Sequence, residues 1–288
     1  MACDSLYCAY LKAYYPFEFY TTALKLYTEK GKKDKIALLI DEMRRYYSIT
    51  MQTGTFGQDN RDWAYDKENR TISQNLTAVK HITKSSTASL YRISTKRYNT
   101  FTDLLWEMLQ NTSINSREID ILIKLGYFKF FGEENKLLAV AEEFRNGTSR
   151  LTKTVKSYET RLEVMREFEK NLHVPPAVAS QKAAWEFEFT GMCLSSDKYE
   201  RGVYIVTDVD DKYSIKIRLY NVSRGRQTEW LRMKKDIYGV MKPEAGEIIK
   251  LKPEDCKTMP KRIWANGTST FSNTENETWI TNFRRVKT

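Results

Sequence analysis

The chain has 288 residues, of which 47 are lysine or arginine and 37 are aspartate or glutamate, so its formal net charge at pH 7 is +10. Such an excess favours an anionic partner, either a nucleic acid or a membrane surface. Because the sequence has neither an apolar run of membrane-spanning length nor a signal-peptide pattern, we predict a nucleic acid as partner, no membrane and a cytoplasmic location.

Residues that commonly bind metals or perform catalysis are few and scattered. The cysteines and histidines contain no CxxC pair and no spacing typical of zinc ligands: Cys3, Cys8, Cys193, Cys256, His81 and His173. Buried or free thiols in a reducing compartment account better for the cysteines. The sequence also has no phosphate-binding glycine loop and no nucleophile–base pair. We therefore predict no catalytic residue, no metal site and no cofactor in this chain.

The first segment, residues 1–48, has the pattern of amphipathic helices. Apolar residues recur three and four positions apart over residues 6–14, and Pro16 ends this stripe. A second stripe of the same period runs through residues 35–47, after the break at Gly31.

Two helix–turn–helix patterns lie between Leu76 and Phe131. Their apolar residues recur three and four positions apart, so each helix would bury one stripe. The stretch carries eight basic and four acidic residues, and Ser113 or Asn115 is expected to cap the helix that begins near residue 116. Paired helices with cations and turn amides on the outside suit a phosphate backbone. The alternative is an ordinary helical subdomain with solvated charges.

The segment that follows is predicted to be a linker that contains one charged helix. An amphipathic pattern covers residues 157–172, and Pro175 and Pro176 then end the helix.

Near residue 200 the pattern changes from helical to alternating. Strands are expected over residues 203–206, 213–220, 228–234, 247–251 and 278–283. Five short strands of this kind fit an OB-type barrel. Fourteen basic and six acidic residues lie between Lys212 and Arg262. Cations interleaved with aromatic rings suit a single-stranded nucleic acid. The alternative is that the rings fill the barrel core.

Three aspartates in this region, Asp208, Asp210 and Asp211, could indicate a metal site. A polar hairpin turn explains them better, because no partner carboxylate follows at a useful spacing.

Four short motifs carry a resemblance to a known family. They are DSLYCAYLKAYYPFE (4–18), LTAVK (76–80), NSREIDILIKLGYF (115–128) and WEFEFTGMCL (185–194). In order and spacing, the first three resemble the region that follows the catalytic core in bacterial family C replicative DNA polymerases, the DNA polymerase III alpha subunits. The fourth resembles the family segment that leads into a C-terminal OB-fold.

The resemblance implies a multidomain α+β chain with a mainly helical N-terminal half and a C-terminal five-stranded OB-type barrel. Its parts would be the C-terminal part of a polymerase fingers domain (1–48), a helix-hairpin-helix DNA-binding domain (49–145), a helical linker (146–183) and an OB-fold-like nucleic-acid-binding domain (184–288). The family's catalytic palm, which uses magnesium for nucleotidyl transfer, would lie upstream of Met1. We therefore expect a truncated or split polymerase whose catalytic palm is absent from this chain.

The first hairpin departs from the family pattern. His81, Ile82 and Thr83 stand where the family has Gly-Val-Gly, and glycines there allow close approach of the backbone to phosphate. Side-chain donors would then have to replace backbone amides. The residues predicted to contact DNA are Lys80, Lys84, Ser85, Ser86, Arg117 and Lys124 in the helix-hairpin-helix, and Lys212, Tyr213, Lys216, Arg218, Tyr220 and Trp230 in the OB domain.

Two functional hypotheses remain. In the first, the chain is the DNA-binding C-terminal region of a replicative polymerase, which grips primer–template duplex and single-stranded template beside a catalytic polymerase part. In the second, it is a stand-alone nucleic-acid-binding or interaction protein derived from a truncated polymerase. No convincing sliding-clamp-binding peptide is found, so a clamp stays an open question.

Overall fold

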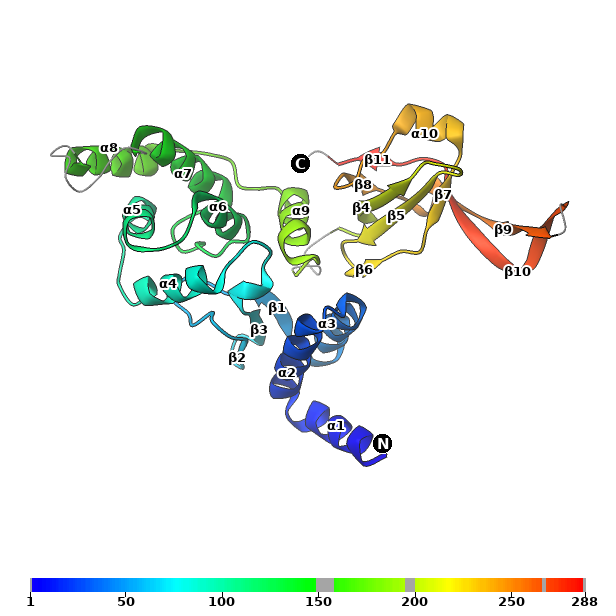
Figure 1. The fold of residues 1–288 in the computed structure, drawn as a ribbon, viewed down its shortest axis with the longest axis horizontal. Coiled ribbons are helices and arrows are strands. Elements are labelled where there is room, and N and C mark those ends of the chain that lie inside the picture. The colour runs from blue at the N-terminus through cyan, green and yellow to red at the C-terminus, as the bar shows by residue number, and fades with distance from the viewer. Residues whose placement is uncertain (1, 149–157, 195–199, 266–267, 287–288) are drawn as a thin grey trace. The chain divides into compact units, whose positions relative to one another are not determined.

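The computed structural model describes residues 2–148, 158–194, 200–265 and 268–286. It divides into two compact units (Figure 1). The first unit consists of residues 1–178 and 185–194, and the second of residues 179–184 and 195–288. The first is mainly helical and the second is built around a sheet, which confirms the prediction of a mixed helical and β chain.

The first unit begins with three helices and a small sheet. The helices are α1 (Ala2–Tyr14), α2 (Pro16–Glu29) and α3 (Lys33–Tyr47). The strands are β1 (Thr50–Thr53), β2 (Ala64–Asp66) and β3 (Thr71–Gln74). The sheet has the order β1-β3-β2, with β1 parallel and β2 antiparallel to β3. Apolar side chains of α2, α3, β1 and β3 share one core, which includes Tyr20, Leu24, Met43, Met51 and Ile72.

The rest of the first unit is helical. Its elements are η1 (Leu76–Ala78), α4 (Lys84–Ser94), α5 (Phe101–Asn111), α6 (Ser116–Lys124), α7 (Glu134–Thr148), α8 (Tyr158–Asn171) and the last turns of α9 (Ala179–Thr190). A second core joins them and includes Leu90, Phe101, Leu122, Phe128 and Phe144. Full burial of each such side chain stabilises the fold by about 1.5–3 kcal/mol. The helix–turn–helix periodicity of the sequence therefore corresponds to buried stripes of α4, α5 and α6.

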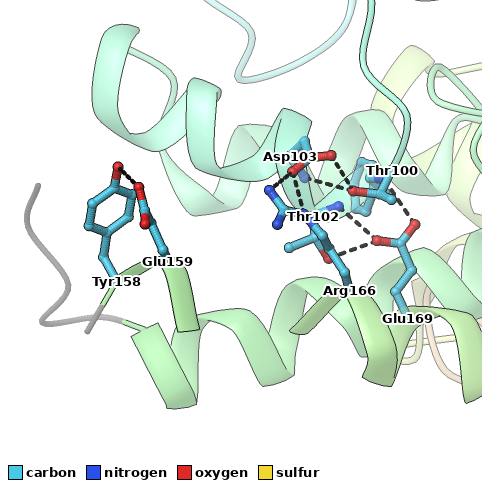
Figure 2. A network of polar contacts seen from close by, with 8 residues as sticks. Thr100, Thr102, Asp103, Tyr158, Glu159, Arg166 and Glu169 are labelled. Atoms are coloured by element: carbon cyan, nitrogen blue, oxygen red, sulfur yellow. Dashed lines mark hydrogen bonds and ion pairs between the residues drawn. The ribbon is translucent and has the colours of Figure 1, made fainter. Parts of the chain in front are cut away.

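Helix α8, which the sequence placed in a linker, packs onto this unit. Leu162 and Met165 belong to the same core. Two polar contacts then hold α8 against the beginning of α5 (Figure 2). The carboxylate of Glu169 accepts hydrogen bonds from the backbone amides of Phe101, at 2.9 Å, and Thr102, at 2.8 Å. It thereby pairs amides that the N-terminus of α5 would leave unsatisfied. Arg166 forms an ion pair with Asp103 at 2.6 Å.

The second unit is built on one large sheet and a short helix. Its elements are β4 (Val203–Asp210), β5 (Lys216–Asn221), β6 (Arg226–Gln227), β7 (Leu231–Met233), α10 (Lys235–Met241), β8 (Ile248–Lys250), η3 (Pro253–Asp255), β9 (Cys256–Ala265), β10 (Thr268–Ile280) and β11 (Arg284–Arg285). The strand order is β11-β8-β4-β5-β7-β10-β9, and β6 pairs with β5. Side chains alternate along β5, so that Ile217 and Leu219 enter the core while Lys216 and Arg218 point to the other face.

The expected five-stranded barrel is corrected in two respects. Eight strands pair in the sheet, and over the described residues they follow an open path that does not close into a barrel. Over the described residues, the end strands β11 and β9 of this path do not pair with each other. Strand β10 pairs with β7 only at Trp279 and Ile280. Its remaining pairing is with β9 alone, in a long antiparallel hairpin that the sequence pattern did not indicate (Figure 1). Helix α10 was also not predicted.

Candidate nucleic-acid interfaces

The turn between η1 and α4 forms the first candidate interface. His81 lies in this turn with a φ of 69°, in the left-handed region that favours glycine. The chain thus adopts a glycine-like backbone conformation at a histidine. Thr83 then begins α4, because its hydroxyl accepts a hydrogen bond from the amide of Ser86 at 3.1 Å.

A buried carboxylate joins this turn to the beginning of α6. Glu118 is 1% exposed, and its Oε1 accepts hydrogen bonds from the backbone amide of Thr83, at 3.2 Å, and from the hydroxyl of Ser86, at 2.7 Å. Its Oε2 accepts the amide of Asn115, whose own side chain caps α6. The predicted cap at Asn115 is therefore confirmed. The role of Glu118 in joining the two helix starts was not predicted.

Four exposed side chains gather where these two helices begin. We call this set the turn cluster; it consists of His81, Lys84, Ser85 and Arg117. Arg117 Nη2 lies 3.1 Å from His81 Nε2. Ser85 Oγ lies 2.8 Å from the hydroxyl of Ser113, which precedes α6. Three of the six residues predicted for the helix-hairpin-helix belong to the turn cluster.

The other three predicted residues have partners within the protein. Lys80 Nζ donates to the backbone carbonyl of Glu188 at 2.6 Å. The ammonium of Lys124 lies 5.9 Å from the ring centre of Trp185 and 5.5 Å from that of Phe189, a cation–π arrangement. Ser86 is 1% exposed and bound to Glu118, so its hydroxyl serves the fold.

A groove on the sheet of the second unit forms the second candidate interface. We call it the sheet groove; it has a volume of about 460 Å³ and is lined by Lys216, Arg218, Glu229, Trp230, Leu231, Arg232, Lys261, Asn276, Glu277 and Thr278. Four of these side chains are basic and two are acidic. The sequence predicted Lys216, Arg218 and Trp230 here. It missed the residues from β9 and β10, because the hairpin itself was not predicted.

Two arginines in the sheet groove are held in place. The guanidinium of Arg218 lies 5.8 Å from the centre of the Trp230 ring, and its Nε donates to the carbonyl of Thr228 at 3.3 Å. Arg232 pairs with Glu277 at 2.9 Å. Within the described part of the chain, Lys216 and Arg218 form no ion pair with a carboxylate. No carboxylate in that part of the chain therefore neutralises the positive charges of these two side chains, and both can attract an anionic ligand.

The remaining predicted OB residues lie differently. Lys212 and Tyr213 are exposed between β4 and β5, with Tyr213 94% exposed. Tyr220 is only 6% exposed, so its ring packs in the protein and presents little surface for a base to stack on. Asp211 accepts a hydrogen bond from Tyr238 at 3.2 Å, and the pKa of that tyrosine is raised by desolvation and by the carboxylate.

Comparison with known proteins gives a partial similarity. No protein-family model matches the chain. The DNA polymerase III subunit alpha of Campylobacter jejuni is 32% identical over 134 residues, which are 45% of this chain and 11% of that protein. The DNA polymerase III subunit alpha of Aquifex aeolicus is 29% identical over 136 residues, which are 46% of this chain and 11% of that protein. The chain thus contains a region similar to part of these subunits and spans about a tenth of their length.

The described residues contain neither a cluster of metal ligands nor a membrane-spanning helix. Nowhere in residues 2–148, 158–194, 200–265 and 268–286 do three or more histidine, cysteine or carboxylate side chains gather as metal ligands would. Over the same residues, no helix combines the length and the apolar character needed to cross a bilayer.

Proposed function

We propose that this chain is a DNA-binding region of a replicative polymerase of the DNA polymerase III alpha kind. The first unit would hold primer–template duplex and the second would hold the single-stranded template during DNA replication, in the cytoplasm. The observation that carries the proposal is the similarity of part of the chain to two DNA polymerase III alpha subunits. The geometry of the two candidate interfaces supports duplex binding by the first unit and single-strand binding by the second.

The turn cluster supports the duplex role. Lys84, Ser85 and Arg117 are exposed hydrogen-bond donors at the beginnings of α4 and α6. Arginine and hydroxyl side chains at helix N-termini bind phosphate oxygens without reading the base sequence. The helix-hairpin-helix assignment fits this arrangement, with contacts from side chains in place of glycine amides.

The sheet groove supports the single-strand role. Four strands of the sheet lie side by side in the order β8-β4-β5-β7. The last of these strands in sequence, β8, therefore lies beside the first, β4, which is the spatial order of a Greek key. In OB-folds, which are partly open Greek-key barrels, the face of the second and third strands binds oligonucleotides. The sheet groove lies on the equivalent strands, β5 and β7. Cations beside the Trp230 ring would follow phosphates while the ring stacks on a base.

Polymerase chemistry would come from another part of the polymerase. Nucleotidyl transfer needs carboxylates that hold two metal ions, and the described residues contain no cluster of that kind. We therefore assign no catalytic step and no magnesium site to this chain.

The exposed face of α1 supports a protein partner in addition to DNA. Leu6, Tyr7, Tyr10 and Tyr14 are each at least half exposed along this helix. Contiguous apolar surface of this kind is typical of interaction sites. We propose the catalytic part of a polymerase as its partner. The alternative is a stand-alone interaction protein, which would bind other proteins through α1 and would not associate with polymerase activity.

Fluorescence anisotropy of labelled DNA tests the proposal. The chain is titrated into primer–template, duplex and single-stranded DNA over a salt series, with matched lysine-to-glutamate variants. In the first unit, Lys84→Glu is compared with Lys129→Glu, an exposed lysine outside the turn cluster. In the second, Lys216→Glu is compared with Lys235→Glu, an exposed lysine on α10.

The expected result is a logarithm of affinity that falls linearly with the logarithm of salt concentration. Lys84→Glu should weaken duplex binding and reduce the salt slope by about one, and Lys216→Glu should do the same for single strands. The two control variants should change either affinity much less. If no DNA is bound at low salt, or if the controls weaken binding as much as the test variants, the proposal is wrong.

A further inference from the structure

His81 occupies an unusual place in the turn cluster. Its backbone has a φ of 69°, and its imidazole is exposed. Arg117 Nη2 lies 3.1 Å from His81 Nε2. A guanidinium has only N–H donors, so Nε2 must accept this hydrogen bond. The contact therefore requires a neutral imidazole that carries its proton on Nδ1.

The charged groups around His81 are mostly positive. Lys80 and Lys84 flank the turn, and Arg117 approaches from α6. On the elements packed against the turn, α6 carries the carboxylates Glu118 and Asp120, and α9 carries Glu186 and Glu188. Asp120 forms an ion pair with Arg145 at 2.7 Å. Glu118 is buried and bound to Thr83, Ser86 and Asn115, and Glu188 contributes its backbone carbonyl to Lys80. Among the described residues, none of these four carboxylates forms an ion pair with His81.

Protonation changes the chemistry of this pair. A second proton on the imidazole converts Nε2 into a donor and ends its hydrogen bond with Arg117. Two cationic donors then face each other about one hydrogen-bond length apart. Their repulsion is relieved when an oxyanion lies between them, because an anionic oxygen accepts from both. A phosphodiester has oxygens of this kind.

We propose that His81 and Arg117 form a proton-dependent phosphate clamp for duplex DNA. The inference rests on the proposed function of the first unit. It adds His81 as a DNA contact and protonation of the imidazole as the condition for that contact. With His81 neutral, Arg117 is held by the imidazole. With His81 protonated, both side chains donate to one backbone phosphate, so duplex affinity is higher when the imidazole is charged.

The conformation of the turn provides a clean test variant. Glycine adopts a φ of 69° without strain, so His81→Gly removes the imidazole and should preserve or stabilise the turn. Asparagine also tolerates this conformation, so His81→Asn serves as a second variant. The sequence has only two histidines, so His173→Asn is a matched control for every other histidine effect. Thermal unfolding establishes that each variant is folded.

Anisotropy with a labelled 20-base-pair duplex is measured from pH 5.5 to pH 8.0 at constant ionic strength. The wild type and His173→Asn should bind roughly two- to fivefold more tightly at the acidic end, the gain expected from one exposed ion pair. Their salt slope should be larger by about 0.9 at pH 5.5, which corresponds to one more neutralised phosphate. Both His81 variants should show neither change.

The outcomes separate this inference from the proposed function. If the chain binds duplex DNA and the His81 variants keep the wild-type pH dependence, the clamp is wrong while the duplex role stands. If the wild type binds duplex with no pH dependence, the clamp is likewise wrong. If no form binds duplex at any pH, the duplex role itself fails.

Discussion

The hydroxyl of Ser86 donates a hydrogen bond of 2.7 Å to the carboxylate of Glu118. Both side chains are 1% exposed, and the contact joins the start of α4 to the start of α6. This relationship joins the first turn of α4, which contains Lys84, to the first turn of α6, which contains Arg117, although these two residues lie 33 positions apart in the sequence. The geometry of the turn cluster therefore depends on a residue that itself has no access to a ligand.

Replacing Glu118 by glutamine tests this dependence. The carboxylate accepts three hydrogen bonds through two oxygens, whereas an amide would place a donor opposite the amide of either Thr83 or Asn115. We expect the free energy of unfolding to fall by about 1–3 kcal/mol in urea denaturation. Glu142→Gln, on the exposed surface of α7, should change it by less than about 0.5 kcal/mol. Equal stability of the two variants would contradict the role of Glu118.

Glu169→Ala tests whether α8 is part of the folded unit. The substitution leaves the amides of Phe101 and Thr102 and the hydroxyl of Thr102 without their acceptor. We expect a loss of roughly 2–4 kcal/mol in the unfolding of the first unit, since hydrogen bonds to a charged group are involved. Glu167→Ala, on the exposed side of α8, is the control. A helix that serves only as a linker would make the two variants equivalent.

Stability at alkaline pH should depend on Tyr127. Burial raises the pKa of this phenol well above its usual value of about 10, while Asn60 donates a hydrogen bond to its oxygen at 3.3 Å. Because the pKa of this phenol is raised in the folded state, the buried neutral phenol contributes its full stability below about pH 10. That contribution is lost as pH rises further. Burial raises the pKa of Tyr98 to about 12 and adds to the same trend.

Tyr127→Phe should therefore cost about 0.5–1.5 kcal/mol at pH 7, through the lost hydrogen bond, and lose less stability than the wild type between pH 10 and pH 12. Urea unfolding at a series of pH values measures both effects. Tyr7→Phe, at an exposed tyrosine, is the control. If Tyr127→Phe loses stability over this range as steeply as the wild type, ionisation of Tyr127 is not a cause.

The cysteines should differ widely in reactivity. Cys193 is buried, and burial, followed by the charge of Glu186, raises the pKa of its thiol well above the usual value. Cys8 is exposed. Because the thiolate is the nucleophile, iodoacetamide at pH 8 should modify Cys8 at least about tenfold faster than Cys193. Mass-spectrometric peptide mapping over time measures the two rates, and comparable rates would show that Cys193 is accessible.

Trp230 should dominate stacking in the sheet groove. Its ring is 42% exposed and lies beside the Arg218 guanidinium. If it stacks on one base, Trp230→Ala should weaken single-strand binding by about 1–3 kcal/mol while leaving duplex binding nearly unchanged. Phe130→Ala removes an exposed ring from the first unit and should leave single-strand binding unchanged. Titrations of labelled oligonucleotides measure both, and equal effects of the two variants would contradict a stacking role.

The sequence alone determined the local features of this protein. Apolar periodicity predicted helices that overlap α1, α3, α4, α5, α6 and α8, and alternation predicted strands that overlap β4, β5, β7 and β8. The cap at Asn115 was predicted because a cap lies within one helical turn of the amides it binds. Features of this kind depend on neighbours in the chain, and the sequence displays those neighbours directly.

Only the tertiary structure decided which polar side chains face solvent. Lys84 and Ser86 are two positions apart in one predicted contact set, yet Lys84 is exposed while Ser86 is buried against Glu118. Lys80 likewise donates to a carbonyl 108 positions away. Lys261 lines the sheet groove and lies on β9, in a hairpin that the sequence pattern did not predict. The solvent exposure and the hydrogen-bond partners of a side chain depend on groups that are distant in the chain. A pattern of nearby residues therefore does not predict them.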